Sequence, residues 1–390
     1  MDTPPTSPFV ASEKFGKQDA FFPLSPEPEE GSFQKLKPSS LGFLQNDLSV
    51  VHNPAMQEVL LRCYEGQPGL AANALYGSGR YDLYRNQFIK VGKMLDRGSA
   101  AYIFELIDNT GLEMVVKCPT SKRKTQQILK EAMILRVLQH PQNHIVPFEG
   151  ITYMNKGHMR QLRSSETVPA LVLKRFDMNL NRFISIYHKT LDIGVAKQIW
   201  WSLFKNLLFA LSYMKTKNII HGDIKTSNVL LNIPKTNGIE NAQFYLADFT
   251  SAEIIPEQDN QDFNPQIETT LEYCAPELIG AFDINVETDA KNRPSTETDL
   301  YAVGLCLMSF VTGFEPFDEL YSQFSKGNIP NASPVQKSQW LLNAISKRDP
   351  ISMNILSHDL YNDWSNEIDV LSKILNERVS LEELILMTQH

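Results

Sequence analysis

The sequence of 390 residues predicts a bilobal α+β fold, with a small antiparallel sheet followed by a larger, mainly helical part. Between residues 88 and 176, short runs of apolar and β-branched residues are separated by polar turns, which is typical of strands. From residue 197 onward, apolar residues recur every three or four positions, which is typical of helices on a core. Strands in one part of a chain and helices in the next predict an α+β arrangement.

The small lobe is expected to contain a five-stranded sheet and one helix. The amphipathic run at 126–138 predicts the helix, and Asp-Asn-Thr-Gly at 108–111 predicts a turn. The expected strands are 88–95, 100–107, 112–118, 151–154 and 170–176.

The large lobe is expected to open with a helix over 197–215. Its apolar residues fall on one face, at positions 200, 203, 204, 207, 208, 211 and 214. Trp200 and Trp201 are interpreted as packing residues of this helix. The longest apolar run, 301–311, is far shorter than the ~20 residues that cross a bilayer, so it predicts a buried helix.

Composition and charge exclude several classes of function. Hydrophobic residues make up 42% of the chain and charged residues 21%, as in ordinary globular proteins. The net charge of −8 argues against a nucleic-acid partner, because nucleic-acid binders carry a basic surface. The N-terminus has neither a basic leader nor an apolar core, so it is not expected to be a signal peptide. The shortness of the apolar run at 301–311 argues against a membrane partner. The four cysteines form no Cys-x-x-Cys pair, which argues against zinc or a disulfide framework and favours a cytoplasmic or nuclear protein.

Residues 221–228 read His-Gly-Asp-Ile-Lys-Thr-Ser-Asn, and Asp248 follows twenty residues after Asn228. Phosphoryl transfer needs a base that orients the attacking hydroxyl and oxygen ligands that hold Mg²⁺ on the triphosphate. Asp223 is the candidate base, and Lys225 can neutralise charge on the transferring group. Asn228 and Asp248 are the candidate metal ligands.

These residues resemble the catalytic loop and Asp-Phe-Gly motif of the eukaryotic protein kinases. Upstream, Lys117 ends a Met-Val-Val-Lys run that looks like the third-strand signature of this family, and Glu131 follows in the predicted helix. Downstream, 274–277 and 299–304 are similar to the Ala-Pro-Glu motif and to the start of the central large-lobe helix. These motifs keep the family's order across about 88–385.

The resemblance implies a protein-kinase fold, ATP as co-substrate, Mg²⁺ as cofactor and protein substrates. The catalytic residues would be Asp223, Lys225, Lys117 and Glu131, with Glu131 holding Lys117. The nucleotide would be bound by Gly98, Ser99, Lys117, Asn228 and Asp248, the last two through the metal. His221 would support the metal-binding loop, and buried Asp299 would accept hydrogen bonds from the catalytic loop. Lys225 and Thr270 are typical of the serine/threonine branch.

Four positions depart from the family pattern. Gly98 alone remains of the three glycines over the phosphates. Gly222 replaces an arginine that binds the activation-loop phosphate in many kinases, so a non-RD enzyme that does not need this phosphate is expected. Thr250 replaces the glycine of Asp-Phe-Gly, and its stiff side chain should make the loop flip less readily. The usual arginine partner of Glu277 is missing after residue 350, and Arg348 is the expected substitute.

Two other functions remain alternatives at this point. A pseudokinase scaffold would bind partners without phosphate transfer, and the depleted glycine loop and Thr250 favour it. Against it, the chain keeps the three residues that pseudokinases usually lose, at Lys117, Asp223 and Asp248. A small-molecule kinase is disfavoured because such enzymes lack the Ala-Pro-Glu segment.

The domain organisation is predicted to have three parts. Residues 1–40 hold seven of the 22 prolines and are expected to form a disordered Pro/Ser-rich arm. A partly ordered extension over 41–87 precedes a kinase domain over 88–385, whose lobes divide near 175.

Thr3, Ser7 and Ser25 in the arm each precede a proline, so a proline-directed kinase is a candidate partner. The spacing of Thr3 and Ser7 also resembles phosphodegrons read by F-box ubiquitin ligases.

Overall fold

The computed structural model describes residues 90–388, apart from 99, 108–112, 122–123, 141, 156–166, 237, 256–268, 283–292, 319–332 and 347–357. Several predictions fall outside the described residues. They are the arm over 1–40, the extension over 41–87, the turn at 108–111, Ser99 and Arg348.

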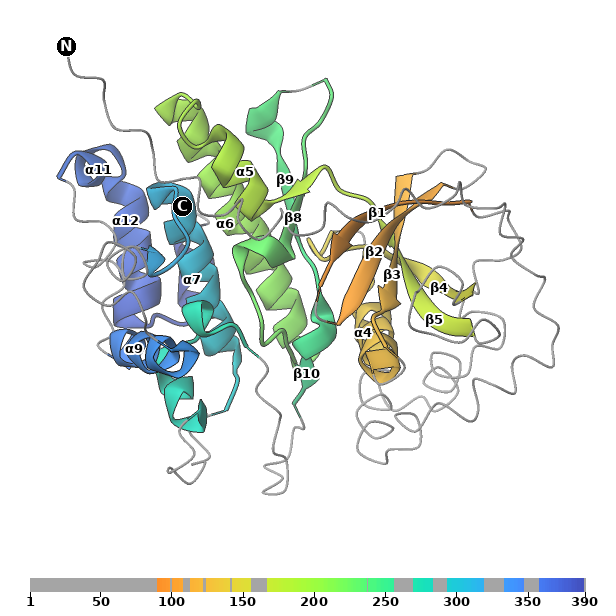
Figure 1. Ribbon diagram of the computed structural model, residues 1–390. Helices are drawn as coiled ribbons and strands as arrows, with labels where there is room; N and C mark the ends of the chain where they lie inside the picture. The colour runs from red at the N-terminus through yellow and green to blue at the C-terminus, as the bar shows by residue number, and fades with distance from the viewer. Residues whose placement is uncertain are drawn as a thin grey trace, which may run out of the picture.

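The small lobe is an antiparallel sheet with strand order β1-β2-β3-β5-β4 (Figure 1). Its strands are β1 (Lys90–Arg97), β2 (Ala101–Ile107), β3 (Glu113–Pro119), β4 (Phe148–Asn155) and β5 (Thr167–Lys174). The helix α4 (Thr125–Val137) packs against β3, β4 and β5. The predicted five-stranded sheet with its helix is therefore confirmed.

The strand β4 begins three residues earlier than the sequence pattern indicates. Phe148 pairs with Leu173, but Gly150 pairs with Val172, so a bulge lies between the two pairs. A bulge adds one unpaired residue and breaks the alternation of inward and outward side chains. The first part of β4 is therefore not visible as a strand in the sequence.

The helix α4 presents one apolar face to the sheet. Ile128, Ala132 and Leu135 lie three or four residues apart and are at most 1% exposed. The same spacing places Glu131 on the buried side, where its exposure is 0%. A buried carboxylate needs a charged or hydrogen-bonding partner, so such a partner is required opposite Glu131.

The large lobe is mainly helical, and in Figure 1 its helices lie on the opposite side of the molecule from the sheet. Its first helices along the chain are α5 (Leu180–Tyr187), α6 (Ile193–Lys215), α7 (Thr296–Thr312) and α9 (Pro334–Ser346). The helices near the C-terminus are α11 (His358–Asp363), α12 (Ser365–Ser372) and α13 (Leu381–Met387), with a π-helical turn at Lys373–Glu377. The expected bilobal α+β fold is confirmed.

The helix α6 begins four residues before its predicted start at 197. The side chain of Asp192 accepts hydrogen bonds from the backbone N–H groups of Gly194 and Val195, so it caps the helix. All seven positions of the predicted apolar stripe, from Trp200 to Met214, are buried. Trp200 is a packing residue, as predicted, and its indole N–H donates to the carbonyl of Leu307.

The helix α7 contains the apolar run 301–311, and every residue from Thr298 to Thr312 is buried. Ser295 and Thr298 form a capping box at its start, and Gly313 ends it with a φ of 76°. Among the described helices, none combines the length and the apolar character that a membrane span requires.

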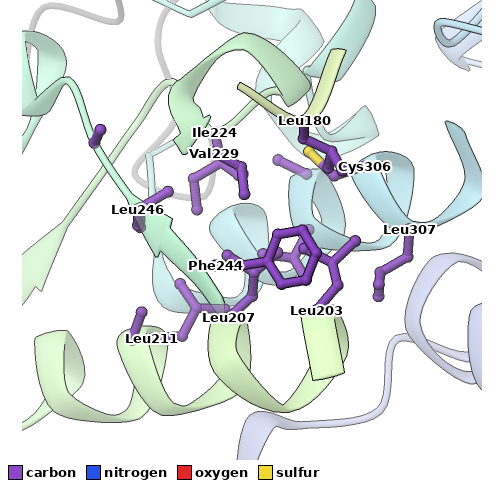
Figure 2. Close-up of a cluster of buried hydrophobic side chains, with 14 of the residues drawn as sticks. Leu180, Leu203, Leu207, Leu211, Ile224, Val229, Phe244, Leu246, Cys306 and Leu307 are labelled. Atoms are coloured by element: carbon purple, nitrogen blue, oxygen red, sulfur yellow. The ribbon is translucent and has the colours of Figure 1, made fainter. Parts of the chain in front are cut away.

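The core below the catalytic loop brings α6, α7 and a small sheet together (Figure 2). This sheet has the order β6-β8-β9, from β6 (Met178–Asn179), β8 (Val229–Asn232) and β9 (Gln243–Leu246). Phe244 and Leu246 of β9 lie in the cluster with Leu203, Leu207 and Leu211 of α6. The hairpin β8-β9 thus fixes two chain segments on one rigid base, the segment before β8 and the segment after β9.

The two lobes are also joined by backbone bonds at β9. The N–H of Val146 donates to the carbonyl of Leu246 at 2.9 Å, and the N–H of Leu246 donates to the carbonyl of His144 at 2.8 Å. A second pair of short strands, β7 (Ile219–Ile220) and β10 (Glu253–Ile254), flanks the same region. Residues 221–228 and 247–252 are therefore held between paired strands at the boundary of the lobes.

Candidate active site

Lys117 lies on β3, which has a neighbouring strand on each side. It pairs with Ile103 of β2 and with Leu171 of β5, so its backbone position is fixed by the sheet. The ammonium Nζ lies 2.8 Å from Oε1 and 2.6 Å from Oε2 of Glu131. Lys117 is only 6% exposed and Glu131 0%, so the two charges form a buried ion pair between sheet and helix.

Asp248 is brought to the same ammonium from the large lobe. It follows β9 directly and adopts a left-handed backbone with φ of 64°. Its Oδ1 lies 2.6 Å from Nζ of Lys117, while 44% of its side chain stays exposed. The predicted convergence of Lys117, Glu131 and Asp248 is thus present in the structure.

Burial and charge act in opposite directions on these three groups. Burial alone would lower the pKa of Lys117, but the carboxylates of Glu131 and Asp248 outweigh it and raise that pKa. Burial raises the pKa of Glu131 in spite of the Lys117 charge. The pKa of Asp248 is lowered well below its usual range, because Lys117 outweighs the effect of burial. Asp248 is therefore ionised at neutral pH, as a metal ligand must be.

The carboxylate of Asp223 is held by four donors, one of which is the amide nitrogen of Asn228, 3.4 Å from Oδ2. Oδ1 of Asp223 accepts from the backbone N–H of Thr270 at 3.0 Å and from the Thr270 hydroxyl at 2.7 Å. Its Oδ2 accepts from Nζ of Lys225 at 2.8 Å, and this Nζ also contacts the Thr270 hydroxyl oxygen at 2.9 Å. The predicted link from the catalytic loop to the segment around Thr270 is confirmed.

Asn228 lies beside Asp223 in the 3₁₀ turn Thr226–Asn228. Its side-chain amide nitrogen donates to the backbone carbonyl of Asp223 at 2.9 Å. Its own backbone carbonyl accepts from the N–H of Ala247, the residue before Asp248, at 2.9 Å. A backbone hydrogen bond therefore links Asn228 to the residue before Asp248.

The donor atoms of Asn228 and Asp248 fit a hard cation. With the amide nitrogen of Asn228 engaged, its amide oxygen is the group that can bind a metal, and Asp248 adds a carboxylate. Within the described parts of the chain, no group of three or more His, Cys, Asp or Glu residues is arranged to hold a metal ion. Mg²⁺ suits such a site, because it is commonly bound by one or two protein oxygens together with substrate phosphates.

His221 and Asp299 have the supporting positions that were predicted. Oδ2 of Asp299 accepts from the backbone N–H of His221 at 2.6 Å, and Oδ1 accepts from that of Gly222 at 3.0 Å. Burial raises the pKa of Asp299 to about 7, although these two hydrogen bonds act to lower it. The His221 ring contacts the ring of Phe249, with centroids 4.7 Å apart, and lies 3.0 Å from the carbonyl of Ala247. Burial lowers the pKa of His221.

The turn between β1 and β2 contains Gly98. The backbone N–H of Gly98 donates to the carbonyl of Ala101 at 2.8 Å, which closes the turn. The carboxylate of Asp96 accepts from the N–H of Arg97 at 2.7 Å. Gly98 therefore lies in the expected tight connection, and its role in nucleotide binding stays a prediction.

The expected partner of Glu277, Arg348, lies outside the described residues, so that pairing stays a prediction. Glu277 forms an ion pair with Arg378, 101 residues further along the chain. The guanidinium of Arg378 also lies over the ring of Tyr301, 4.8 Å from its centroid. Arg378 stands two residues before Ser380, which caps α13 with Glu383. The Ser-x-x-Glu pattern at Ser380 is a signal that could have located the start of this helix, but nothing local indicates the contact with Glu277.

Sequence reasoning also missed an ion pair between the lobes. Nζ of Lys130, next to Glu131 on α4, lies 2.5 Å from Oε1 of Glu253 on β10. The two side chains are 19% and 23% exposed. Glu253 follows the Asp248 motif by five residues, so this pair fastens the start of the activation segment to α4.

The fold and the site define a protein kinase. The chain matches the family described as "Protein kinase domain" over residues 89–383, and it belongs to that family. The resemblance to eukaryotic protein kinases is thus confirmed.

Three fungal protein kinases are similar to this chain. The chain is 42% identical to "Serine/threonine-protein kinase ISR1" of Saccharomyces cerevisiae, over 75% of this chain and 67% of that protein. It is 38% identical to the protein of the same name from Eremothecium gossypii, over 73% of this chain and 75% of that protein. A more distant relative, "DNA damage response protein kinase DUN1" of Saccharomyces cerevisiae, is 28% identical over 59% of this chain and 43% of its own. The sequence motifs had also indicated a likeness to a fungal kinase known as the inhibitor of staurosporine resistance, and the two first relatives bear this out.

Proposed function

We propose that the protein transfers the γ-phosphate of ATP to serine or threonine hydroxyls of protein substrates. The observation that carries this proposal is the convergence of Lys117, Glu131 and Asp248 across the two lobes. The names of the two fungal relatives, both serine/threonine-protein kinases, support the acceptor class.

Asp223 would orient the acceptor hydroxyl and take its proton on the carboxylate. Its orientation is fixed before the substrate arrives, because Thr270 and Lys225 hold both of its oxygens. A positioned carboxylate of this kind contributes roughly 10²- to 10⁴-fold to a rate. Lys225 would place its positive charge next to the transferring group, where it offsets developing negative charge.

Lys117 would bind phosphate oxygens, and Glu131 would keep its ammonium in place. Asn228 and Asp248 would hold Mg²⁺, which supplies a Lewis acid that neutralises phosphate charge when bound. The two ligands come from opposite sides of the β8-β9 hairpin, so the hairpin sets their separation. The turn at Gly98 would cover the nucleotide.

We infer that this kinase works without a phosphate on its activation segment, as a non-RD enzyme. Gly222 has φ of 78°, and a Cβ at this position would lie 3.1 Å from the carbonyl oxygen of Ser251, so the loop is adapted to glycine. Two direct contacts take the place of a phosphate-bound arginine, Thr270 with Asp223 and Lys130 with Glu253. Treatment with a phosphatase should leave the rate within about twofold, and a large loss would contradict the inference.

The main test compares the purified wild type with Asp223→Ala and Lys117→Arg, using labelled ATP, Mg²⁺ and a peptide array. Each substitution should lower the rate at least ~10²-fold. Asp223→Ala removes the base, and Lys117→Arg keeps the charge but replaces the compact ammonium between Glu131 and Asp248 with a planar guanidinium of different reach. Thr216→Val, which changes an exposed cap at the end of α6, is the control for handling and folding. Wild-type protein that binds nucleotide but labels no peptide would instead support the pseudokinase scaffold.

We also propose, from the sequence alone, that the arm over 1–40 receives phosphates from a proline-directed kinase and is then read by an F-box ubiquitin ligase. The protein would act in the cytosol or the nucleus, where such enzymes work. Replacing Thr3 and Ser7 with alanine should lengthen the half-life of the protein, and an unchanged half-life would count against this role.

A further inference from the structure

Thr250 occupies an unusual place among the charged groups of the site. Its hydroxyl oxygen lies 2.5 Å from Oδ1 of Asp248, 3.1 Å from Nζ of Lys117 and 3.3 Å from Oε2 of Glu131. All three charged groups, Lys117, Glu131 and Asp248, therefore contact one neutral side chain. A glycine at this position has no group that could make these contacts.

The hydroxyl has one proton and two lone pairs, so its bonds can be assigned. The ammonium of Lys117 can only donate, so Thr250 accepts from it. The single hydroxyl proton then goes to a carboxylate, and Oδ1 of Asp248 is nearer than Oε2 of Glu131. Lys117 also contacts Oδ1 of Asp248 directly, at 2.6 Å. Thr250 thus adds a second link beside this ion pair, in which Lys117 donates to Thr250 and Thr250 donates to Asp248. Bonds to ionised groups are stronger than neutral ones.

The backbone of the same turn is tied to α4 as well. Thr250 lies in the 3₁₀ turn Phe249–Ser251, and the N–H of Phe249 donates to Oε1 of Glu131 at 3.2 Å. The Phe249 ring is fully buried against His221. A backbone bond and a side-chain bond therefore connect this turn to the ion pair of the small lobe.

We propose that Thr250 is a positioning residue, whose hydroxyl reinforces the direct contact between Lys117 and Asp248 and keeps Asp248 turned toward the site. The proposal rests on the proposed kinase function for its consequence, but the contact itself is a property of the free protein. Asp248 needs this support, because its side chain is 44% exposed and its left-handed backbone is uncommon for a residue other than glycine.

The hydroxyl, and not only the stiffness of the side chain, carries this role. Stiffness comes from branching at Cβ, which valine shares with threonine. The hydrogen bonds come from the hydroxyl, which serine shares with threonine. The variants Thr250→Val and Thr250→Ser therefore separate the two properties, and Thr250→Gly removes both.

The first readout is amide hydrogen exchange in the nucleotide-free protein, followed on a peptide that includes the N–H of Phe249. Loss of one bond to a charged group corresponds to roughly tenfold in an opening equilibrium, so Thr250→Val and Thr250→Gly should exchange about tenfold faster. Thr250→Ser should exchange at the wild-type rate. Thr216→Val is the matched control, since its hydroxyl bonds a backbone carbonyl at the end of α6.

The second readout is the Mg²⁺ concentration that gives half of the maximal rate. It should rise several-fold in Thr250→Val and return to the wild-type value in Thr250→Ser. Equal exchange in wild type and Thr250→Val, or faster exchange in Thr250→Ser than in Thr250→Val, would overturn the proposal. Should Asp223→Ala keep full activity, the kinase mechanism would fail while the exchange result would still decide the role of Thr250.

Discussion

The ion pair between Lys130 and Glu253 predicts a measurable coupling between α4 and the activation segment. The two charged atoms are 2.5 Å apart, and about a fifth of each side chain is exposed. At an effective dielectric constant of about 20, the direct attraction amounts to several kcal/mol. Desolvation and the ordering of two long side chains remove most of it, which leaves about 1 kcal/mol. Removal of either partner should therefore shift the equilibrium between the attached and the detached activation segment by roughly fivefold.

A double-mutant cycle measures this coupling. The variants are Lys130→Ala, Glu253→Ala and the double variant, and the measured quantities are the free energy of unfolding in urea and kcat/KM. Each single variant should lower both quantities, and the second substitution should then add little. The pair between Lys215 and Glu382 is the matched control, because its distance is 2.6 Å but its side chains are 40% and 59% exposed.

The control pair should give a coupling below about 0.5 kcal/mol in the same cycle. Fully additive effects of Lys130→Ala and Glu253→Ala on kcat/KM would refute the reasoning. In that case the direct contact would not replace an activation-loop phosphate, and the non-RD proposal would lose one of its two supports.

Two further predictions concern the large lobe. Arg378→Ala removes the ion pair with Glu277 and the contact with the ring of Tyr301, so the free energy of unfolding should fall by about 2 kcal/mol, whereas Arg348→Ala should leave it unchanged. A similar loss in both variants would contradict the assignment of Arg378. The pKa of Asp299 is raised from 3.8 to about 7, so the folded state binds more protons than the unfolded state between these values, and stability should fall as the pH rises through this window. In Asp299→Asn this part of the pH dependence should disappear from the urea midpoints, and an unchanged slope would refute it.

Much of the fold could be predicted because it depends on short-range patterns. The spacing from Trp200 to Met214 identified the buried face of α6, and the run at 301–311 identified the buried helix α7. Boundaries were less predictable, since they depend on pairing and capping. The bulge at Gly150 concealed the start of β4, and the cap at Asp192 extended α6 toward the N-terminus.

The chemistry of the candidate site was also visible in the sequence, because phosphoryl transfer needs particular residue types in a particular order. Lys117, Glu131, Asp223 and Asp248 could be named before any geometry was known, and the structure brings the first two and the last together. Their roles in catalysis remain predictions to be tested by substitution.

By itself, the sequence determined which groups are available and which faces of each element are apolar. Only the tertiary structure decided the partners of Glu277, Lys130 and Thr250, which lie 101, 123 and up to 133 residues away along the chain. The physical reason is that a charged or hydroxyl group bonds to a partner only when the folded chain places that partner within about 3 Å of it. Local periodicity carries no information about such contacts, because they depend on how distant segments pack together, within the large lobe for Glu277 and between the lobes for Lys130 and Thr250.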